Sequence, residues 1–197
     1  MSDIVKITSG TYRGRKIATP GGKTHPMGER ERLALFNIIG DEIKDKQVLD
    51  AYAGSGALGF EALSRGAKKV LFVEEGHMAM RTIMNNAISL GIPEQEVAFY
   101  RGAVGAFYRK FVQGQGAAIL PSMAASTETF PKQVDIILAD PPYDDFNPEE
   151  IRQLAEDYLR DGGLLVLSHP DEAPEFQRFT LEDTRQYAGA HLSFYRK

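Results

Sequence analysis

The sequence predicts a doubly wound α/β fold, with a mostly parallel, seven-stranded sheet and a small N-terminal β-hairpin. Apolar strand patterns alternate with helical patterns from residue 48 onward, which is typical of a parallel sheet with helices on both faces. A glycine-rich turn joins the first of these strands to a helix. Residues 176–196 are predicted to add two strands that close the sheet in antiparallel orientation.

The elements follow in chain order from the spacing of apolar residues. Residues 4–18 alternate in character around Gly10 and Gly14, which predicts the hairpin, and Leu33, Leu35, Phe36 and Ile39 predict a helix over 28–42. Residues 113–132 are rich in Gly, Ser, Thr and Pro and predict a long, mobile loop. The remaining patterns predict strands at 48–50, 70–73, 97–100, 134–139 and within 162–169, and helices at 58–65, 77–90, 104–112 and 148–159.

Length and composition favour one soluble domain. The 197 residues are 43% hydrophobic and 25% charged, and no apolar run approaches the roughly 20 residues of a membrane span. The start of the chain lacks the pattern of a signal peptide, and there is no cysteine, so we expect a cytoplasmic protein without a disulfide or thiolate metal site. The four histidines lack metal-ligand spacing, so we expect no metal.

Positive charge is concentrated near the N-terminus of an otherwise acidic chain. The net charge is −4 and the pI is about 5.6, yet the stretch from Ile4 to Gly28 carries five cations and no acid. We interpret residues 1–26 as a basic arm and residues 27–197 as the main domain; the alternative is a solvated surface hairpin without a partner. The five cations are Lys6, Arg13, Arg15, Lys16 and Lys23.

The glycine-rich turn predicts a nucleoside-type cofactor. Gly54, Gly56 and Gly59 stand in the order G-x-G-x-x-G between a strand and a helix. Glycines there permit positive φ and close approach of the main chain to a ligand. Glu74 ends the next strand, where a carboxylate can accept hydrogen bonds from both ribose hydroxyls.

The position of Asp50 discriminates between two such cofactors. A dinucleotide brings a pyrophosphate, which a nearby carboxylate repels. Asp50 lies just before the turn and suits the amino and sulfonium groups of S-adenosylmethionine. The sequence therefore favours S-adenosylmethionine over a dinucleotide and over a turn used only for packing.

The stretch IILADPPYDDF, residues 136–146, predicts a second part of the site. Its apolar strand stops at Pro141 and Pro142, which cannot continue a hydrogen-bonded ladder. Left at the strand end are the Asp140 carboxylate, the rigid Pro141 carbonyl and the Tyr143 ring. Two acceptors can hold an exocyclic amine while its lone pair turns toward a methyl group, and an aromatic ring can stack on a base.

These residues resemble a known group of enzymes. DAYAGSGALGFEALSRGA followed by LADPPY is similar to the class I S-adenosylmethionine-dependent amino-methyltransferases. The flanking stretches SGTYRGRKIATP, ERERLALFNII and AGAHLSFYRK resemble the RsmD family of 16S ribosomal RNA guanine-N2 methyltransferases. The resemblance covers nearly the whole chain. It implies a Rossmann-like fold, S-adenosylmethionine as cofactor, and ribosomal RNA as partner, either as naked RNA or within a partly assembled small subunit.

The resemblance also implies roles for individual residues. The catalytic set is Asp140, Pro141, Pro142 and Tyr143. The residues expected to bind the cofactor are Asp50, Ala53, Gly54, Ser55, Gly56, Glu74, Gly102 and Ala103. Contacts with RNA are expected from Arg13, Arg15, Lys16, His25 and Arg30.

The chain departs from the family pattern in three places. Residues 25–29 replace an Arg-Pro-Thr stretch and an Asp, Gly102 replaces an Asp or Asn that faces adenine, and the 113–132 insert is long. At Gly102 we expect main-chain N–H groups to serve instead. Two other functions stay open: methylation of another amine, such as adenine N6 in DNA or a glutamine, and an RNA-binding assembly factor without catalysis.

Overall fold

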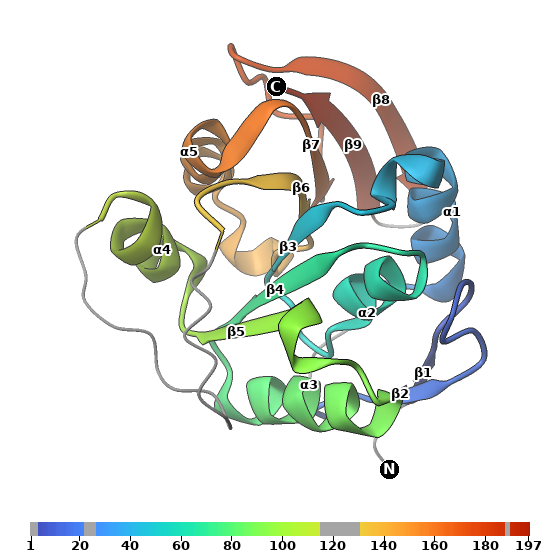
Figure 1. Cartoon of the computed structure of the whole chain (residues 1–197). Helices are drawn as coiled ribbons and strands as arrows, with labels where there is room; N and C mark the ends of the chain where they lie inside the picture. Colours follow the sequence, from blue (N-terminus) through green and yellow to red (C-terminus); the bar gives the residue numbers. More distant parts are fainter. Residues whose placement is uncertain (1–3, 22–26, 115–130, 188–189) are drawn as a thin grey trace.

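The computed structural model describes residues 4–21, 27–114, 131–187 and 190–197. The strands of the main sheet are β3 (Gln47–Ala51), β4 (Lys69–Glu74), β5 (Val97–Arg101), β6 (Val134–Ala139), β7 (Leu159–His169), β8 (Thr180–Tyr187) and β9 (Ala190–Arg196). They lie in the order β5-β4-β3-β6-β7-β9-β8 (Figure 1). The first five strands in this order are parallel, and β9 pairs antiparallel with both β7 and β8. The predicted fold class is confirmed.

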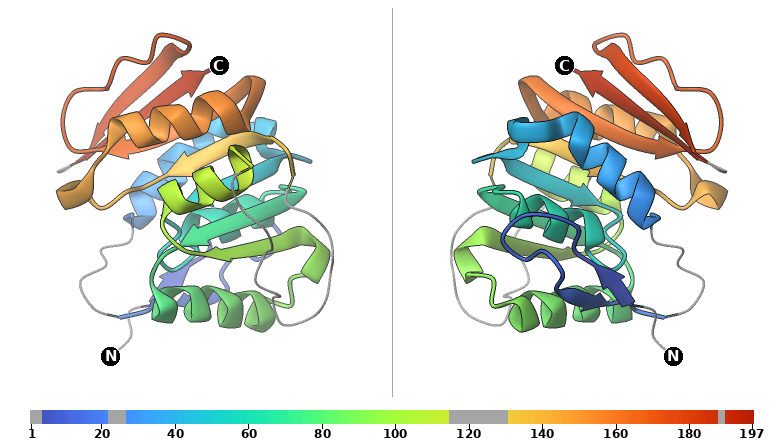
Figure 2. Two further views of the ribbon diagram at one scale, coloured as in Figure 1. Left: turned by 90° about the vertical axis from the view of Figure 1, so that its left-hand side faces the viewer. Right: turned by 90° about the vertical axis from the view of Figure 1, so that its right-hand side faces the viewer.

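Helices cover both faces of this sheet (Figure 2). One face carries α1 (Glu29–Ile39), α2 (Ala57–Ser64) and α3 (His77–Leu90), and the other carries α4 (Val104–Phe107) and α5 (Pro148–Tyr158). Successive strand residues point to opposite faces, so Val48 packs in the first core and Leu49 in the second. Burying one such side chain stabilises the fold by about 1.5–3 kcal/mol.

The predicted hairpin is also present, as β1 (Ile4–Lys6) paired antiparallel with β2 (Lys16–Ala18). It packs on the main domain, since Ile7 and Ile17 are buried in the same core as α1–α3. Buried Glu61 of α2 accepts hydrogen bonds from the Thr8 main-chain N–H at 2.8 Å and from its hydroxyl at 2.6 Å. The hairpin is therefore fixed to the helix that follows the glycine turn.

Gly10 permits this docking. Its φ is +77°, and a Cβ at this position would lie 1.6 Å from the Ser64 carbonyl oxygen. The neighbouring Thr11 N–H donates to that same oxygen at 2.8 Å. Only glycine lets the hairpin approach α2 so closely.

Two elements differ from their predictions. The helix expected over 104–112 is one turn of α-helix, α4, followed by a π-helical turn at Tyr108–Val112. Strand β7 begins at Leu159, before Gly162 and Gly163, with a register shift opposite β6 between Val134 and Ile136. A glycine pair reads as a turn in sequence, but a bulge accommodates it within a strand. The loop predicted at 113–132 lies mostly outside the described residues.

No helix among the described residues is long and apolar enough to cross a membrane. Within residues 4–21, 27–114, 131–187 and 190–197, no three His, Asp or Glu side chains are grouped as a metal site.

Candidate active site

The carboxyl ends of β3, β4 and β6 bring the predicted site residues together. Asp50 and Ala51 of β3 pair with Leu138 and Ala139 of β6, and β4 lies on the other side of β3. The turn after β3 therefore lies beside the Asp-Pro-Pro-Tyr loop after β6. This is the switch point of a doubly wound sheet, where ligands bind.

The turn itself is built by its glycines. Gly54 has φ +57° and Gly56 has φ +79°. A Cβ on Gly56 would lie 2.6 Å from the Phe60 ring, so packing demands glycine there, whereas a Cβ on Gly54 would find its nearest atom at 4.0 Å. The main chain at Gly54 thus leaves room for a ligand to approach. Ala53, also predicted to bind the cofactor, donates its N–H to the Val73 carbonyl at 3.0 Å.

Asp50 is 1% exposed and holds the start of α2 in place. Its Oδ2 accepts a hydrogen bond from the Gly59 N–H at 2.8 Å. Burial raises the pKa of the Asp50 carboxyl well above its ordinary value, and the charges of Asp140 and Glu74 raise it further, while the Gly59 bond opposes the shift. Asp50 therefore stabilises the turn by binding the main chain of the helix that follows it.

Glu74 connects the turn with the loop after β4. One carboxylate oxygen accepts from the Gly54 N–H at 2.8 Å, and the other accepts from the Gly76 N–H at 2.6 Å. This carboxylate lies where the sequence predicts the ribose contact. Each oxygen keeps a further lone pair that a hydroxyl could use.

Ser55 supplies an independent sign of a ligand. Its side chain is 5% exposed, and its hydroxyl has no hydrogen-bond partner among the residues that the structure describes. An unpaired buried hydroxyl costs free energy, so such groups usually have a partner. A polar group of a bound molecule would satisfy it, and the amino and carboxylate groups of S-adenosylmethionine fit this requirement.

The prediction for Gly102 is wrong in one respect. Its N–H is not free for adenine, because it donates to the Glu74 main-chain oxygen at 2.9 Å. A Cβ at Gly102 would lie 2.9 Å from the Tyr100 ring, which explains the glycine by packing. Ala103 is exposed and precedes α4, at the end of the neighbouring strand β5.

The Asp-Pro-Pro-Tyr loop presents one carboxylate and one ring. Asp140 is half-buried, and burial, with a smaller effect of the Glu31 charge, raises its pKa to about 6. Pro141 is buried, whereas Pro142 and Tyr143 are exposed. The loop continues into a short 3-10 helix over Tyr143–Asp145. A rigid main chain thus displays Asp140 and Tyr143 beside the turn.

Two further residues lie next to the predicted ones, Tyr52 along the chain and Ser168 through a contact with Tyr143. Tyr52 has φ +65°, rare for a residue with a side chain, and its hydroxyl donates to Glu150 of α5 at 3.1 Å. Ser168 of β7 lies 2.7 Å, hydroxyl to hydroxyl, from Tyr143. The sequence analysis named neither residue: Tyr52 lies within the predicted turn stretch between Asp50 and Gly54, whereas nothing in the sequence linked Ser168 to a residue 25 positions earlier.

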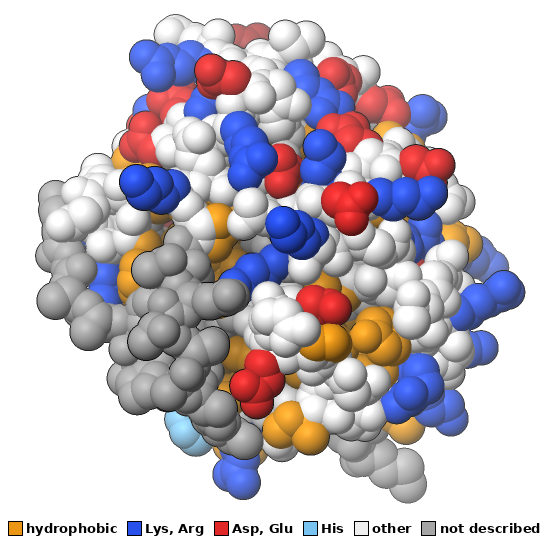
Figure 3. Space-filling view, viewed as in Figure 1, with side chains coloured by type: hydrophobic (Ala, Val, Ile, Leu, Met, Phe, Trp, Pro, Cys, Tyr) orange, Lys and Arg blue, Asp and Glu red, His pale blue; other side chains and the backbone are white. Residues whose placement is uncertain are grey.

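The residues predicted to bind RNA are exposed where the structure describes them. Arg13, Arg15 and Lys16 lie on the hairpin and Arg30 on α1; His25 lies outside the described residues. Arg15 also donates to the Ser89 carbonyl at 2.7 Å. Lys and Arg side chains gather at the edge of the molecule where Figure 1 draws the hairpin, whereas elsewhere on this face they alternate with acids (Figure 3).

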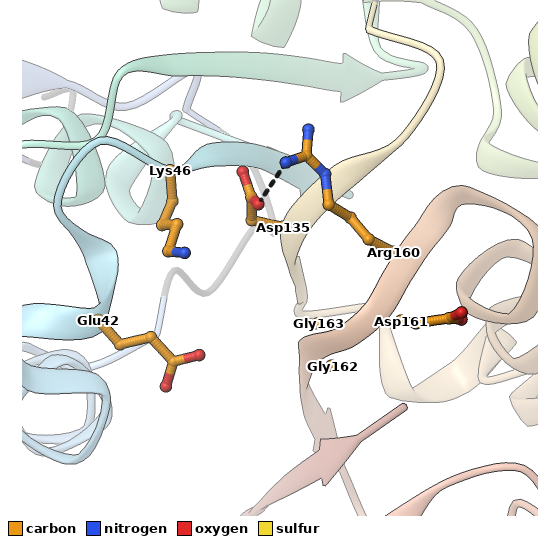
Figure 4. A pocket seen from close by; sticks show the side chains of 7 residues that line it. All are labelled: Glu42, Lys46, Asp135, Arg160, Asp161, Gly162 and Gly163. Atoms are coloured by element: carbon orange, nitrogen blue, oxygen red, sulfur yellow. Dashed lines mark ion pairs between the residues drawn. The ribbon is translucent and has the colours of Figure 1, made fainter.

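A surface depression at the opposite, amino-terminal ends of the strands does not belong to this site. It lies where β3 and β6 begin, and the Arg160 guanidinium pairs there with Asp135 at 2.9 Å (Figure 4). Its lining mixes both signs of charge and holds none of the predicted site residues. The lining residues are Glu42, Lys46, Asp135, Arg160, Asp161, Gly162 and Gly163.

Comparison with known proteins defines the family. The family described as Conserved hypothetical protein 95 matches residues 5–196. The chain belongs to this family. Among curated relatives, "Putative rRNA methyltransferase YlbH" of Bacillus subtilis is 29% identical over 171 residues, covering 85% of this chain and 84% of that one. "Ribosomal RNA small subunit methyltransferase D" of Haemophilus influenzae is 48% identical over 71 residues, covering 36% and 37%.

Solved structures share this fold over nearly the whole length of the chain. "Putative methyltransferase yhhF" from Escherichia coli is 26% identical with a TM-score of 0.79, covering 99% of this chain and 98% of that one. At 13% identity and a TM-score of 0.68, the fold recurs in SMU.776 complexed with SAH, with 93% of this chain and 54% of that one covered. The predicted resemblance to the RsmD family and the predicted enzyme class, a methyltransferase, are confirmed.

Proposed function

We propose that this protein transfers a methyl group from S-adenosylmethionine to the exocyclic N2 amine of a guanine in 16S ribosomal RNA. The observation that carries the proposal is the adjacency of two loops, the glycine turn after β3 and the Asp-Pro-Pro-Tyr loop after β6, on paired strands. The names of the relatives, rRNA methyltransferase and small subunit methyltransferase, point to the same substrate class.

The residues around the turn hold the cofactor. S-adenosylmethionine, when bound, supplies a methyl group activated by its sulfonium sulfur. The open main chain at Gly54 and the unpaired Ser55 hydroxyl receive its methionine part, and Glu74 receives the ribose. Asp50 holds the glycine turn in place by accepting a hydrogen bond from the Gly59 N–H.

Asp140 and Tyr143 hold the target base. The lone pair of a guanine amine is delocalised into the ring, so the amine is a poor nucleophile. Hydrogen-bond acceptors that hold its N–H groups favour a pyramidal nitrogen whose lone pair points toward the methyl group. The Asp140 carboxylate and the Pro141 carbonyl are such acceptors, and the exposed Tyr143 ring stacks on the base. S-adenosylmethionine held by Gly54, Ser55 and Glu74 would supply an electrophilic methyl group to the amine nitrogen, and its sulfur would keep the electron pair of the broken carbon–sulfur bond. Asp140 stabilises the cationic amine and takes the proton that leaves it.

The hairpin contacts the RNA backbone. Arg13 and Lys16 are exposed on it, and it is fixed to α2 through Glu61. A basic surface held rigidly on the main domain gives phosphate contacts that position the RNA without reading its sequence. We take the partly assembled small subunit as the substrate.

The labelled product tests the proposal. The protein is incubated with tritiated S-adenosylmethionine and either naked 16S RNA or small-subunit particles that lack guanine methylation, and the RNA is digested. We expect the label in N2-methylguanosine, with particles the better substrate. Label in N6-methyladenosine or in protein would assign another amine, and cofactor binding without any transfer would favour an assembly factor.

A further inference from the structure

Ser168 lies at the end of β7, beside the loop proposed to hold the target amine. Strands β6 and β7 are parallel, and Ala139 pairs with Leu167, so Ser168, the next residue of β7, lies level with Asp140, the first residue after β6. The Ser168 side chain is 2% exposed. Its hydroxyl is therefore enclosed by the protein and must find its partners there.

The first partner is Tyr143. The two hydroxyl oxygens lie 2.7 Å apart, the ordinary length of a strong O–H···O bond. Tyr143 is 37% exposed, so this bond fixes the hydroxyl end of a side chain that is partly open to solvent.

Asp140 lies beside Ser168 on the neighbouring strand end, because Ala139 of β6 pairs with Leu167 of β7. A hydrogen bond from the Ser168 side chain lowers the pKa of the Asp140 carboxyl, while burial and the Glu31 charge raise it. A serine hydroxyl has one proton and two lone pairs. If Ser168 donates that proton to the carboxylate, Tyr143 must donate its own proton to Ser168, and both bonds are satisfied together.

We propose that Ser168 is a positioning residue for methyl transfer, whose hydroxyl donates to Asp140 and accepts from Tyr143 and so fixes the amine acceptor and the base-stacking ring in one arrangement. This inference rests on the proposed function and deepens it. Without Ser168, the carboxylate and the ring would each lose their link to β7. Displacing a reacting group by about 1 Å can lower the rate roughly 10²-fold.

The charged groups around Asp140 define what a change at Ser168 should do. Glu31 faces it from α1, Asp50 from β3 and Tyr143 from its own loop, and each of these is an acid. Replacing the Ser168 hydroxyl removes a donor and leaves these acids in place. The pKa of Asp140 should therefore rise above about 6, and the ionised, amine-accepting form should require a higher pH.

Ser193 provides a matched control. It is a fully buried serine on β9, and its hydroxyl bonds to His169 at 2.8 Å and to Thr184 at 2.9 Å. Ser193→Ala thus removes a buried hydroxyl and two hydrogen bonds on the adjacent strand, and among the described residues the Ser193 hydroxyl bonds to neither Asp140 nor Tyr143. Any effect of losing a buried serine in general will appear in both variants.

The experiment compares Ser168→Ala, Ser168→Thr and Ser193→Ala with the parent. Single-turnover methylation is measured from pH 5 to 9 with small-subunit particles, and S-adenosylmethionine affinity is measured by calorimetry. For Ser168→Ala we expect a rate roughly 10- to 100-fold lower at pH 7, an acidic limb shifted to higher pH and an affinity within about twofold of the parent. Ser168→Thr, which keeps a hydroxyl, should restore the pH profile.

Two results overturn the inference: a Ser168→Ala protein with the parent's rate and pH profile, or a Ser193→Ala protein with the same losses. A carboxyl ¹³C NMR titration of Asp140 separates this outcome from failure of the proposed function, since it needs no substrate. A parent that labels no guanine overturns the proposed function. In that case, a carboxyl pKa that is higher in Ser168→Ala than in the parent still establishes the Ser168 bond, and an unchanged pKa refutes it.

Discussion

The Glu74 carboxylate accepts a hydrogen bond from the Gly54 N–H at 2.8 Å and thereby ties the end of β4 to the turn after β3. The same carboxylate is proposed to bind the ribose. Glu74→Ala should lower S-adenosylmethionine affinity about 10- to 100-fold, as expected for losing hydrogen bonds to a charged group. Calorimetry measures this change. Glu75, the exposed neighbour of Glu74, offers a control. An equal loss of affinity in Glu75→Ala, or parental affinity in Glu74→Ala, would refute the assignment.

Charge reversal on the hairpin tests its contact with RNA. Arg13 and Lys16 are exposed there, whereas Arg15 also bonds to Ser89 and is left unchanged. Arg13→Glu with Lys16→Glu should weaken RNA binding and flatten its salt dependence, because fewer counterions are released. Arg178→Glu, an exposed residue just before the edge strand β8, should change neither. Filter binding at several salt concentrations decides; an unchanged salt slope in the double variant would make the hairpin purely structural.

Gly10 and Gly14 form a matched pair for the docking of the hairpin. Both have positive φ, +77° and +82°, so alanine at either costs about 1–2 kcal/mol of backbone strain. Only at Gly10 does a Cβ also collide with the main chain, at 1.6 Å from the Ser64 oxygen. Gly10→Ala should therefore lower the free energy of unfolding well beyond Gly14→Ala. Equal losses in urea titrations would show that the close approach to α2 is unimportant for stability.

The sequence predicted the parts of the site that local pattern determines. The glycine spacing, the apolar run before Pro141 and the acid at Glu74 each carry their meaning within a few residues. The partners of Tyr143 and Thr8 could not be predicted, since Ser168 and Glu61 lie 25 and 53 positions away and meet them only through the sheet order and the packing of the hairpin. The bond between Gly102 and Glu74 depends in the same way on the register of β4 and β5.

The raised pKa of Asp140 predicts a pH-dependent cost to stability. Burial raises it from 3.8 to about 6, so this carboxyl contributes stability below pH 3.8 that is lost as the pH rises through about 6. Asp140→Asn carries no charge at any pH. It should unfold at a higher temperature than the parent at pH 8, by an amount worth on the order of 1–3 kcal/mol, and the gain should shrink toward pH 4. A melting-temperature difference that does not change with pH would contradict the prediction.

The single-turnover methylation rate of Asp140→Ala on small-subunit particles tests the central claim most directly. Asp144→Ala, an exposed acid in the same loop, is the control, and Asp140→Asn, which keeps a weaker acceptor, should fall between parent and alanine. The account predicts a loss of about 10²-fold or more in Asp140→Ala, with S-adenosylmethionine affinity within about twofold of the parent. An Asp140→Ala protein that methylates guanine at the parental rate would remove the Asp-Pro-Pro-Tyr loop from the active site.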